Sequence, residues 1–259
     1  MSVSPYLSLI VPAYNEAKSI RRTLGAIRAF LDQQPYSYEI IVAADGNDGS
    51  RELVAKLAAR DPRISVIGSA ERGGKGRGIR NGVAMARGQI IGFADADYKT
   101  PIEEMDKLLP WLDSGYHMAI GSRGMAESRI EVPQPLYRRL GSRAFAVAMH
   151  LVIGLWSLHD TQCGFKFFRG DVARDLFSRQ QIDGYMFDVE ILHLAERMGC
   201  RIKEVGVRWH DDGDSRYNPI GGTWRNMQEI FRIRFGKYPQ HIQQTSDVEL
   251  APQEKETSA

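Results

Sequence analysis

The chain has 259 residues, and its 34 basic and 32 acidic residues leave a formal net charge of +2. This length allows one large domain or two small ones. This small net charge says little by itself, although the arginines are unevenly placed, and no nucleic-acid partner is expected. The two cysteines, Cys163 and Cys200, have no disulfide-framework or zinc-site spacing, which indicates a reducing compartment.

The sequence contains no pattern expected of a targeted or membrane-spanning chain. A strand-like run begins at Leu7, so the first residues do not form a signal peptide. The longest apolar stretch, 144–158, is interrupted by polar residues and glycine, and it falls short of the about 20 residues that a spanning helix needs. We expect a cytoplasmic protein, or a peripheral one on the cytosolic face of a membrane.

The first half of the chain alternates apolar runs with segments of helical spacing. The expected elements are strands at Leu7–Val11, Tyr38–Ala43, Ile64–Ile67 and Ile90–Phe93, helices at 17–31, 50–60 and 79–86, and a glycine-rich loop at 72–78. The first strand is expected to end at Pro12, which cannot donate a ladder hydrogen bond. The alternation predicts an α/β fold with a Rossmann-like, mostly parallel central sheet and helices on both faces.

Two acids follow the expected strand Ile90–Phe93 almost directly. Asp95 and Asp97 are separated by one small residue, Ala96. Hard divalent cations such as Mg²⁺ or Mn²⁺ prefer carboxylate oxygens and bridge to phosphate oxygens, and open α/β sheets bind ligands at the carboxyl ends of their strands. The sequence therefore indicates a metal site here. The competing interpretation is that Asp97 caps a helix beginning near Pro101 and Asp95 is a solvated turn residue.

Other polar residues also follow strands and are expected at the same edge of the sheet. They are Tyr14 and Glu16 after the first strand, Asp45 after the second, and Lys75 in the glycine-rich loop. That loop lacks the Walker spacing and the dinucleotide-binding spacing. Its functional interpretation is a backbone cradle beside a nucleotide, with Lys75 nearby, and the alternative is a flexible surface turn.

Several motifs resemble those of family 2 glycosyltransferases with a GT-A fold. They are VPAYNE (11–16), the acidic turn at Asp45-Gly46, RGGKGRG (72–78) and ADADYKTP (94–101). Downstream, Gly121-Ser122-Arg123, DTQCGFK (160–166) and FDVEIL (187–192) are similar to the dolichyl-phosphate β-glucosyltransferase branch. The resemblance implies one GT-A domain over 1–244, with a nucleotide-sugar half at about 7–105 and an acceptor half at 106–244.

The resemblance also implies roles for individual residues. Nucleotide-sugar binding would fall to Pro12, Ala13, Tyr14, Glu16, Asp45, Lys75, Asp95 and Arg216. Asp97 and Asp95 would hold the metal. The family usually has two consecutive acids in the turn after the second strand. In this chain the first of the two is replaced by Ala44, so only Asp45 is present. Asp45 would then read the base alone, which leaves the nucleotide preference open.

The second half carries the expected acceptor site. A strand at Met118–Gly121 leads into Arg123, and Arg138 lies in a basic cluster before the apolar segment 144–158. That segment suits a membrane interface, with a plain core helix as the alternative. Arg123 and Arg138 are candidates to bind an acceptor phosphate bidentately, and Ser215 is a further candidate.

The catalytic candidates are Asp160 and Asp188. Asp188 matches the base of relatives that use hydroxyl acceptors, whereas a phosphate acceptor, whose second pKa is about 6, is already an anion at neutral pH. In the second case the two acids would orient groups instead of taking a proton. Glu190 is either functional or a structural carboxylate.

A strand at Lys203–Trp209 precedes a polar loop at 210–219. In this loop His210 is a candidate third metal ligand, with a solvent-exposed histidine as the competing interpretation. Ser215 and Arg216 resemble a lid that contacts the diphosphate. A basic amphipathic helix at 222–235 is a second candidate membrane surface, and the polar tail 245–259 is expected to be disordered.

These observations predict a metal-dependent, inverting transfer of a hexose, with UDP-glucose as the favoured donor, to a polyprenyl (dolichyl-type) phosphate. The first alternative is a soluble hydroxyl acceptor with Asp188 as general base. A GDP-mannose donor and a non-catalytic nucleotide-binding module are further alternatives. A sugar-1-phosphate nucleotidyltransferase is disfavoured, because it would place its glycine-rich loop directly after the first strand. The sequence is compatible with a homo-oligomer and does not specify one.

Overall fold

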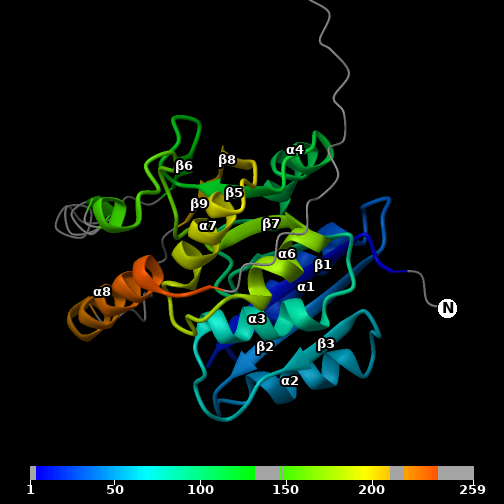
Figure 1. The fold of residues 1–259 in the computed structure, drawn as a ribbon. Coiled ribbons are helices and arrows are strands. Elements are labelled where there is room, and N and C mark those ends of the chain that lie inside the picture. The colour runs from blue at the N-terminus through cyan, green and yellow to red at the C-terminus, as the bar shows by residue number, and fades with distance from the viewer. Residues whose placement is uncertain (1–3, 132–145, 148, 211–218, 239–259) are drawn as a thin grey trace, which may run out of the picture.

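The computed structural model describes residues 4–131, 146–147, 149–210 and 219–238 (Figure 1). The strands are β1 (Leu7–Tyr14), β2 (Tyr38–Asp45), β3 (Ile64–Ile67), β4 (Ile90–Ala94), β5 (Met118–Ser122), β6 (Arg129–Ile130), β7 (Phe165–Arg169), β8 (Ile202–Gly206) and β9 (Arg208–Trp209). The helices are α1 (Ile20–Leu31), α2 (Ser50–Ala58), α3 (Lys75–Met85), the 3₁₀ helix η1 (Ile102–Lys107), α4 (Leu109–Asp113), α6 (Gly170–Ser178), α7 (Phe187–Arg197) and α8 (Pro219–Phe235).

Seven strands form one sheet in the order β3-β2-β1-β4-β7-β5-β8. All neighbouring pairs are parallel except those of β7, which runs antiparallel to both β4 and β5. Strands β6 and β9 form a separate parallel pair. The expected mostly parallel α/β sheet is confirmed.

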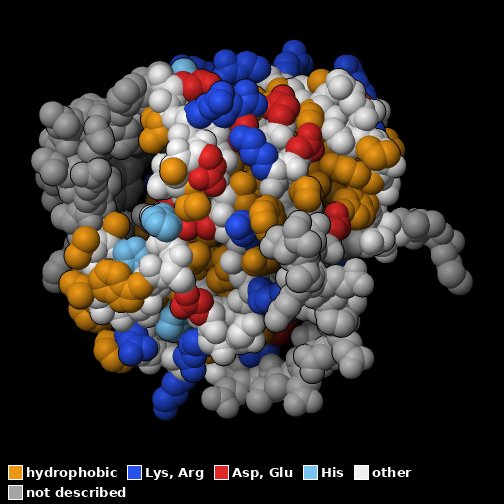
Figure 2. Space-filling model, turned by 90° about the horizontal axis from the view of Figure 1, so that it is seen from above, with side chains coloured by type: hydrophobic (Ala, Val, Ile, Leu, Met, Phe, Trp, Pro, Cys, Tyr) orange, Lys and Arg blue, Asp and Glu red, His pale blue; other side chains and the backbone are white. Residues whose placement is uncertain are grey.

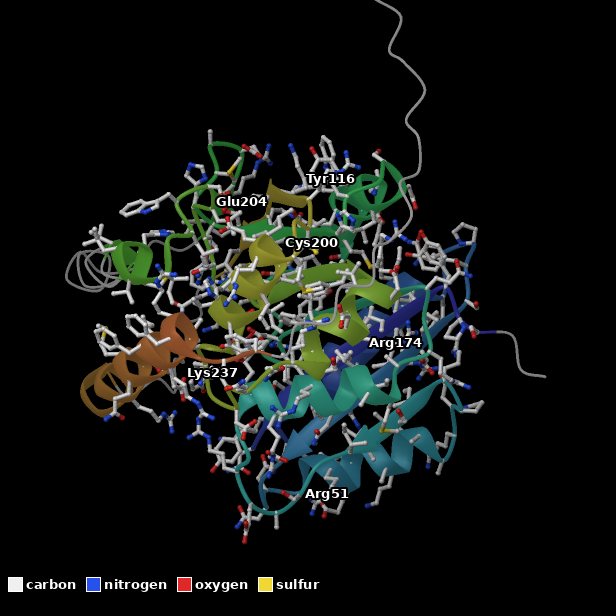
Figure 3. The ribbon with its side chains drawn as sticks, in the orientation of Figure 1. Arg51, Tyr116, Arg174, Cys200, Glu204 and Lys237 are labelled. Atoms are coloured by element: carbon white, nitrogen blue, oxygen red, sulfur yellow. The ribbon has the colours of Figure 1, made fainter. Side chains whose placement is uncertain are left out.

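Helices cover both faces of the sheet, as the alternating pattern predicts (Figure 1). On one face, α1, α2 and η1 pack on side chains such as Leu9, Val42 and Phe167. On the other, α3, α6, α7 and α8 pack on side chains such as Ile10, Phe93 and Phe168. Arg174 of α6, labelled in Figure 3, donates hydrogen bonds to the carbonyls of Ala86 and Gly88 and so ties this helix layer to the turn before β4.

Strand β1 does not end at Pro12 as expected but continues to Tyr14. Its ladder with β4 covers only Leu7–Ile10, while its ladder with β2 runs the full length of the strand. Beyond Ile10 one side of β1 therefore needs no backbone donors, and a proline is tolerated there.

Two further elements differ from expectation. Helix α3 begins at Lys75, inside the glycine-rich loop, with Gly74 just before it at φ +102°. The segment after Pro101 is a 3₁₀ helix without a side-chain cap, so Asp97 does not cap it. In the apolar segment, residues 149–153 are helical. The basic cluster at Arg138 and the loop with Ser215 and Arg216 lie outside the described residues, as does the 245–259 tail.

Candidate active site

The polar motifs meet at one edge of the sheet because of how the strands run. Strands β1, β2, β4 and β5 all point their carboxyl ends to this edge. Antiparallel β7 begins there, since its Phe165 pairs with Ala94 at the end of β4. The chain leaves β1 toward β2 on one side and returns as β4 on the other. This reversal is the switch point at which open α/β sheets bind ligands.

Asp95 and Asp97 lie at this switch point, each beside a lysine. Asp95 Oδ1 is 2.7 Å from Lys75 Nζ, and Asp97 Oδ2 is 3.6 Å from Lys99 Nζ. Both carboxylates remain about a third exposed, at 36% and 35%. Burial, followed by the negative charge of Asp95, raises the pKa of Asp97 to about 6. Two carboxylates with incompletely balanced charge fit a hard divalent cation such as Mg²⁺ or Mn²⁺.

The described residues do not complete a larger ligand cluster. No group of three or more His, Cys, Asp or Glu side chains within them is placed to hold a metal. His210 donates its backbone N–H to Lys99 O, 2.9 Å away, but its ring nitrogen Nδ1 lies 3.3 Å from Glu131 Oε2, and its side chain is 52% exposed. The structure therefore does not bring the ring of His210 to the two aspartates, and its role as a metal ligand stays a prediction.

Asp45 fixes the glycine-rich loop, which is not a free surface turn. One carboxylate oxygen accepts the N–H of Ser69 at 3.1 Å, and the other accepts the N–H of Gly73 at 2.7 Å. Arg77 lies 3.6 Å from the same carboxylate. These contacts bring α3 to the site with Lys75 as its first residue. The expected contact of Asp45 with a nucleoside base stays a prediction.

The turn after β1 is also held in place. Pro12 and Ala13 lie in the last part of the strand, and Tyr14 is partly exposed beneath the guanidinium of Arg72, 4.6 Å from its ring centroid. Glu16 accepts a hydrogen bond from the hydroxyl of Ser19 at 2.5 Å. The nucleotide-binding candidates therefore border the same edge as Asp45 and Lys75.

Asp160 and Arg123, predicted as separate functional residues, form one ion pair. The guanidinium of Arg123 donates to both carboxylate oxygens of Asp160, at 2.7 and 2.9 Å, and its backbone N–H donates at 3.0 Å. Burial alone would raise the pKa of Asp160, but Arg123 outweighs it and lowers that pKa to about 2. Any phosphate bound by Arg123 would share the guanidinium with Asp160.

The two acids of α7 have different surroundings. Glu190 is fully buried and accepts hydrogen bonds from the N–H groups of Gln181 and Ile182 and from Tyr238. It is the structural carboxylate of the two. Asp188 is 3% exposed and pairs with Lys166 at 2.7 Å. Burial raises the pKa of Asp188, whereas the charges of Lys166 and Lys75 oppose that rise.

Three residues that the structure places at the site have no role predicted from the sequence: Lys166, Gly164 and Lys99. Lys166 and Gly164 lie in the quoted DTQCGFK block without a role of their own. A lysine between phenylalanines in a strand-like run is the signal that could have indicated a buried ion pair. Gly164 lies against Asp95, where a Cβ atom would overlap Asp95 Oδ2. No comparable signal marks Lys99.

The sheet order, with two acids at its switch point, is that of a transferase fold of the GT-A type. Residues 8–177 match the family model "Glycosyl transferase family 2", and the chain belongs to this family. It is an enzyme, a glycosyltransferase of the hexosyltransferase type.

Similar proteins bear this out. A dolichyl-phosphate beta-glucosyltransferase of Drosophila melanogaster is 34% identical over 90% of this chain and 75% of its own length. A human protein of the same name is 29% identical over 94% of this chain and 80% of its own. A glucosyl-3-phosphoglycerate synthase from Mycobacterium tuberculosis, solved with Mn²⁺, UDP-glucose and phosphoglyceric acid, has a TM-score of 0.66 at 18% identity, covering 89% of this chain and 79% of that one.

Asp160→Asn should destabilise the protein in a pH-dependent way. Because the folded pKa of Asp160 is lowered to about 2, its charge contributes about 2 kcal/mol above the unfolded pKa near 4. This contribution is lost as the pH falls from about 4 toward 2. Urea unfolding should therefore show a larger gap between wild type and variant at pH 7 than at pH 3. Asp171→Asn, which breaks an exposed pair with Arg169, is the control, and an equal gap at both pH values would contradict the assignment.

Gly164→Ala should impair activity more than stability. The added methyl group meets the flexible end of Asp95 instead of backbone, so the carboxylate moves and the fold is kept. A displacement of about 1 Å at a reacting site can lower turnover roughly a hundredfold. Transferase assays and thermal unfolding measure the two effects. Gly25→Ala, in α1 with no atom near the added group, should leave activity unchanged, and full activity of Gly164→Ala would refute the close approach.

Proposed function

We propose that this enzyme transfers glucose from UDP-glucose to a polyprenyl phosphate of the dolichyl type, with inversion, to give a β-linked product. The observation that carries the proposal is the placement of Asp95 and Asp97 at the switch point beside Lys75, at 2.7 Å from Asp95. This arrangement is suited to a nucleoside diphosphate and a cation. The names of the curated relatives support glucose and the lipid phosphate as substrates.

Each part of the donor has a candidate partner in this chain. Asp97 and Asp95 would hold the divalent cation, which when bound supplies positive charge against the departing diphosphate. Lys75 would add a second positive charge at the same place, and Arg216 is the proposed lid contact. Pro12, Ala13, Tyr14, Glu16 and Asp45 would border the nucleoside. Carboxylate ligands suit both Mg²⁺ and Mn²⁺.

The charge pattern supports an acceptor that is already ionised. The acids nearest the site each have a cation at hand: Asp95 has Lys75, Asp160 has Arg123 and Asp188 has Lys166. A phosphate monoester carries its own nucleophilic anion, since its second pKa is about 6. The acids are then needed to orient cations. Arg123 and Arg138 would bind the acceptor phosphate, and Ser215 is a further candidate for this role.

A soluble hydroxyl acceptor is the second candidate. Asp188 favours it, because burial raises the pKa of this carboxyl and so strengthens it as a base. The similar mycobacterial synthase was solved with the soluble phosphoglyceric acid. A GDP-mannose donor and binding without turnover are the remaining alternatives.

A donor and acceptor screen tests the proposal. UDP-glucose and GDP-mannose are each offered with a short polyprenyl phosphate, a neutral polyprenol and phosphoglyceric acid, and radiolabelled product is counted. UDP-glucose with the polyprenyl phosphate should be the productive pair.

Two variants test the metal assignment and the need for a general base. Asp97→Asn should lower transfer by roughly a hundredfold or more, since charge stabilisation of the leaving group is lost. Asp188→Asn should nearly abolish transfer to a hydroxyl but reduce transfer to a phosphate less, because the phosphate needs no base. Full activity of Asp97→Asn would refute the metal assignment, and phosphoglyceric acid as the best acceptor would refute the lipid phosphate.

We further propose a peripheral membrane contact on the cytosolic face. None of the helices within the described ranges is both long and apolar enough to cross a bilayer. Leu151 and Trp156 are 70% and 62% exposed, and Phe231 and Phe235 of α8 are 49% and 75% exposed. Figure 1 shows the 149–153 helix and α8 on the same side of the molecule.

Basic residues accompany these apolar ones. Arg232 and Arg234 are exposed in the last turn of α8, and Lys237, labelled in Figure 3, lies two residues after the helix ends. Figure 2 shows apolar side chains beside basic ones at the left of the face it presents. Apolar groups flanked by cations complement a bilayer that contains anionic lipid.

Phe231→Ser combined with Phe235→Ser should weaken binding to vesicles that contain phosphatidylserine by at least about tenfold, since two large apolar side chains no longer enter the bilayer. Co-sedimentation measures the binding. Met85→Ser removes an exposed apolar residue of α3 and should leave binding unchanged. Equal binding by wild type and the double variant would exclude α8 as the contact.

A further inference from the structure

Lys166 is a fully buried lysine in the middle of the sheet. Side chains of β7 alternate between the two faces: Phe165 and Phe167 enter the core that contains α1, and Phe168 enters the core that contains α7. Lys166 therefore points toward α7, and its side chain is 0% exposed. A buried ammonium requires an acidic partner and further hydrogen bonds to replace water.

Two oxygens satisfy the ammonium of Lys166. It donates to Asp188 Oδ1 at 2.7 Å and to the carbonyl of Cys163 at 2.6 Å. It also lies over the ring of Phe93, 5.7 Å from the centroid. The lysine thus ties the first turn of α7 to the segment just before β7.

The pair adjoins the proposed diphosphate site through aromatic rings. Phe187 precedes Asp188 and packs on Phe93, with centroids 5.7 Å apart. Lys75 Nζ lies 5.8 Å from the centroid of the same Phe187 ring. Lys75 in turn contacts Asp95. The charges of both lysines lower the pKa of Asp188 against the effect of burial, and Lys166 contributes more than Lys75.

We infer that Lys166 is a positioning residue for the transfer reaction. It holds the Asp188 carboxylate in one orientation and so anchors the first turn of α7. The neighbouring Phe187 ring in that turn then stays in place beside Lys75, which contacts Asp95 at the end of β4. Lys75 then lies where it can stabilise the negative charge that develops on the leaving diphosphate. The inference rests on the proposed donor and is independent of the acceptor.

Lys166→Met and Lys166→Gln test this role, the second keeping an N–H donor without the charge. If Lys166 positions the site, kcat should fall at least thirtyfold for Lys166→Met, with KM for UDP-glucose within threefold of the wild type. Lys166→Gln should recover part of the loss by keeping the hydrogen bond. Lys107→Met, which breaks a 2.6 Å pair with Glu104, is the matched control and should leave kcat unchanged.

A double variant separates positioning from folding. If Lys166 acts through Asp188, Lys166→Met combined with Asp188→Asn should be no slower than the slower single variant. This pair also removes the unbalanced buried charge, so it keeps the test valid should Lys166→Met fail to fold. Unchanged kcat in the single variants, or losses that multiply in the double variant, would overturn the inference.

Measurements on the wild type distinguish a failure of this inference from a failure of the proposed function. Failure of the wild type to use UDP-glucose counts against the proposed donor. The ratio of variant to wild-type kcat, measured with whichever nucleotide sugar the wild type uses, decides the role of Lys166.

Discussion

A carboxylate withdrawn from water needs a cation or several N–H donors, and this requirement shapes the active edge of the sheet. Asp160 is met by Arg123, Asp188 by Lys166 and Asp95 by Lys75. Asp45 and Glu190 are met by backbone N–H groups. Apart from the Glu190 contacts, each pairing joins segments that are distant in sequence. The contacts that balance the charge of the site therefore also hold its loops in place.

The negative charge of Asp97 is less fully compensated than that of these carboxylates. Its lysine lies at 3.6 Å, and its pKa is raised to about 6 by burial and by the neighbouring Asp95. Local charge imbalance of this kind is common at functional sites, because the missing charge arrives with the ligand. The acidic pair that follows β4 is therefore the place where a cation gains most, which agrees with the two carboxylates that the sequence singles out.

The sheet could be predicted from sequence because its strands are apolar runs separated by helical spacing, a pattern that depends only on local residues. The family resemblance assigns functional roles to Asp45, Lys75, Asp95 and Asp160. The direction of the strands then predicts that they meet at one edge of the sheet. Contacts between distant segments could not be predicted. Lys166 meets Asp188 across two layers of the fold, and no local pattern links them.

Other differences have the same origin. Pro12 is tolerated inside β1 because β4 pairs with only the first half of that strand. Helix α3 starts at Lys75 because Asp45 holds Gly73 from another strand. The ring of His210 lies beside Glu131, and neither position in the sequence indicates this contact.

The reversed direction of β7 has a consequence for where this chain can change in length. Strand β5 ends and β7 begins at the same edge of the sheet, so the connection between them starts and ends at the edge that carries the acidic pair. Lengthening a connection whose ends are already fixed costs little free energy. This connection can therefore vary without any change in the order or register of the strands.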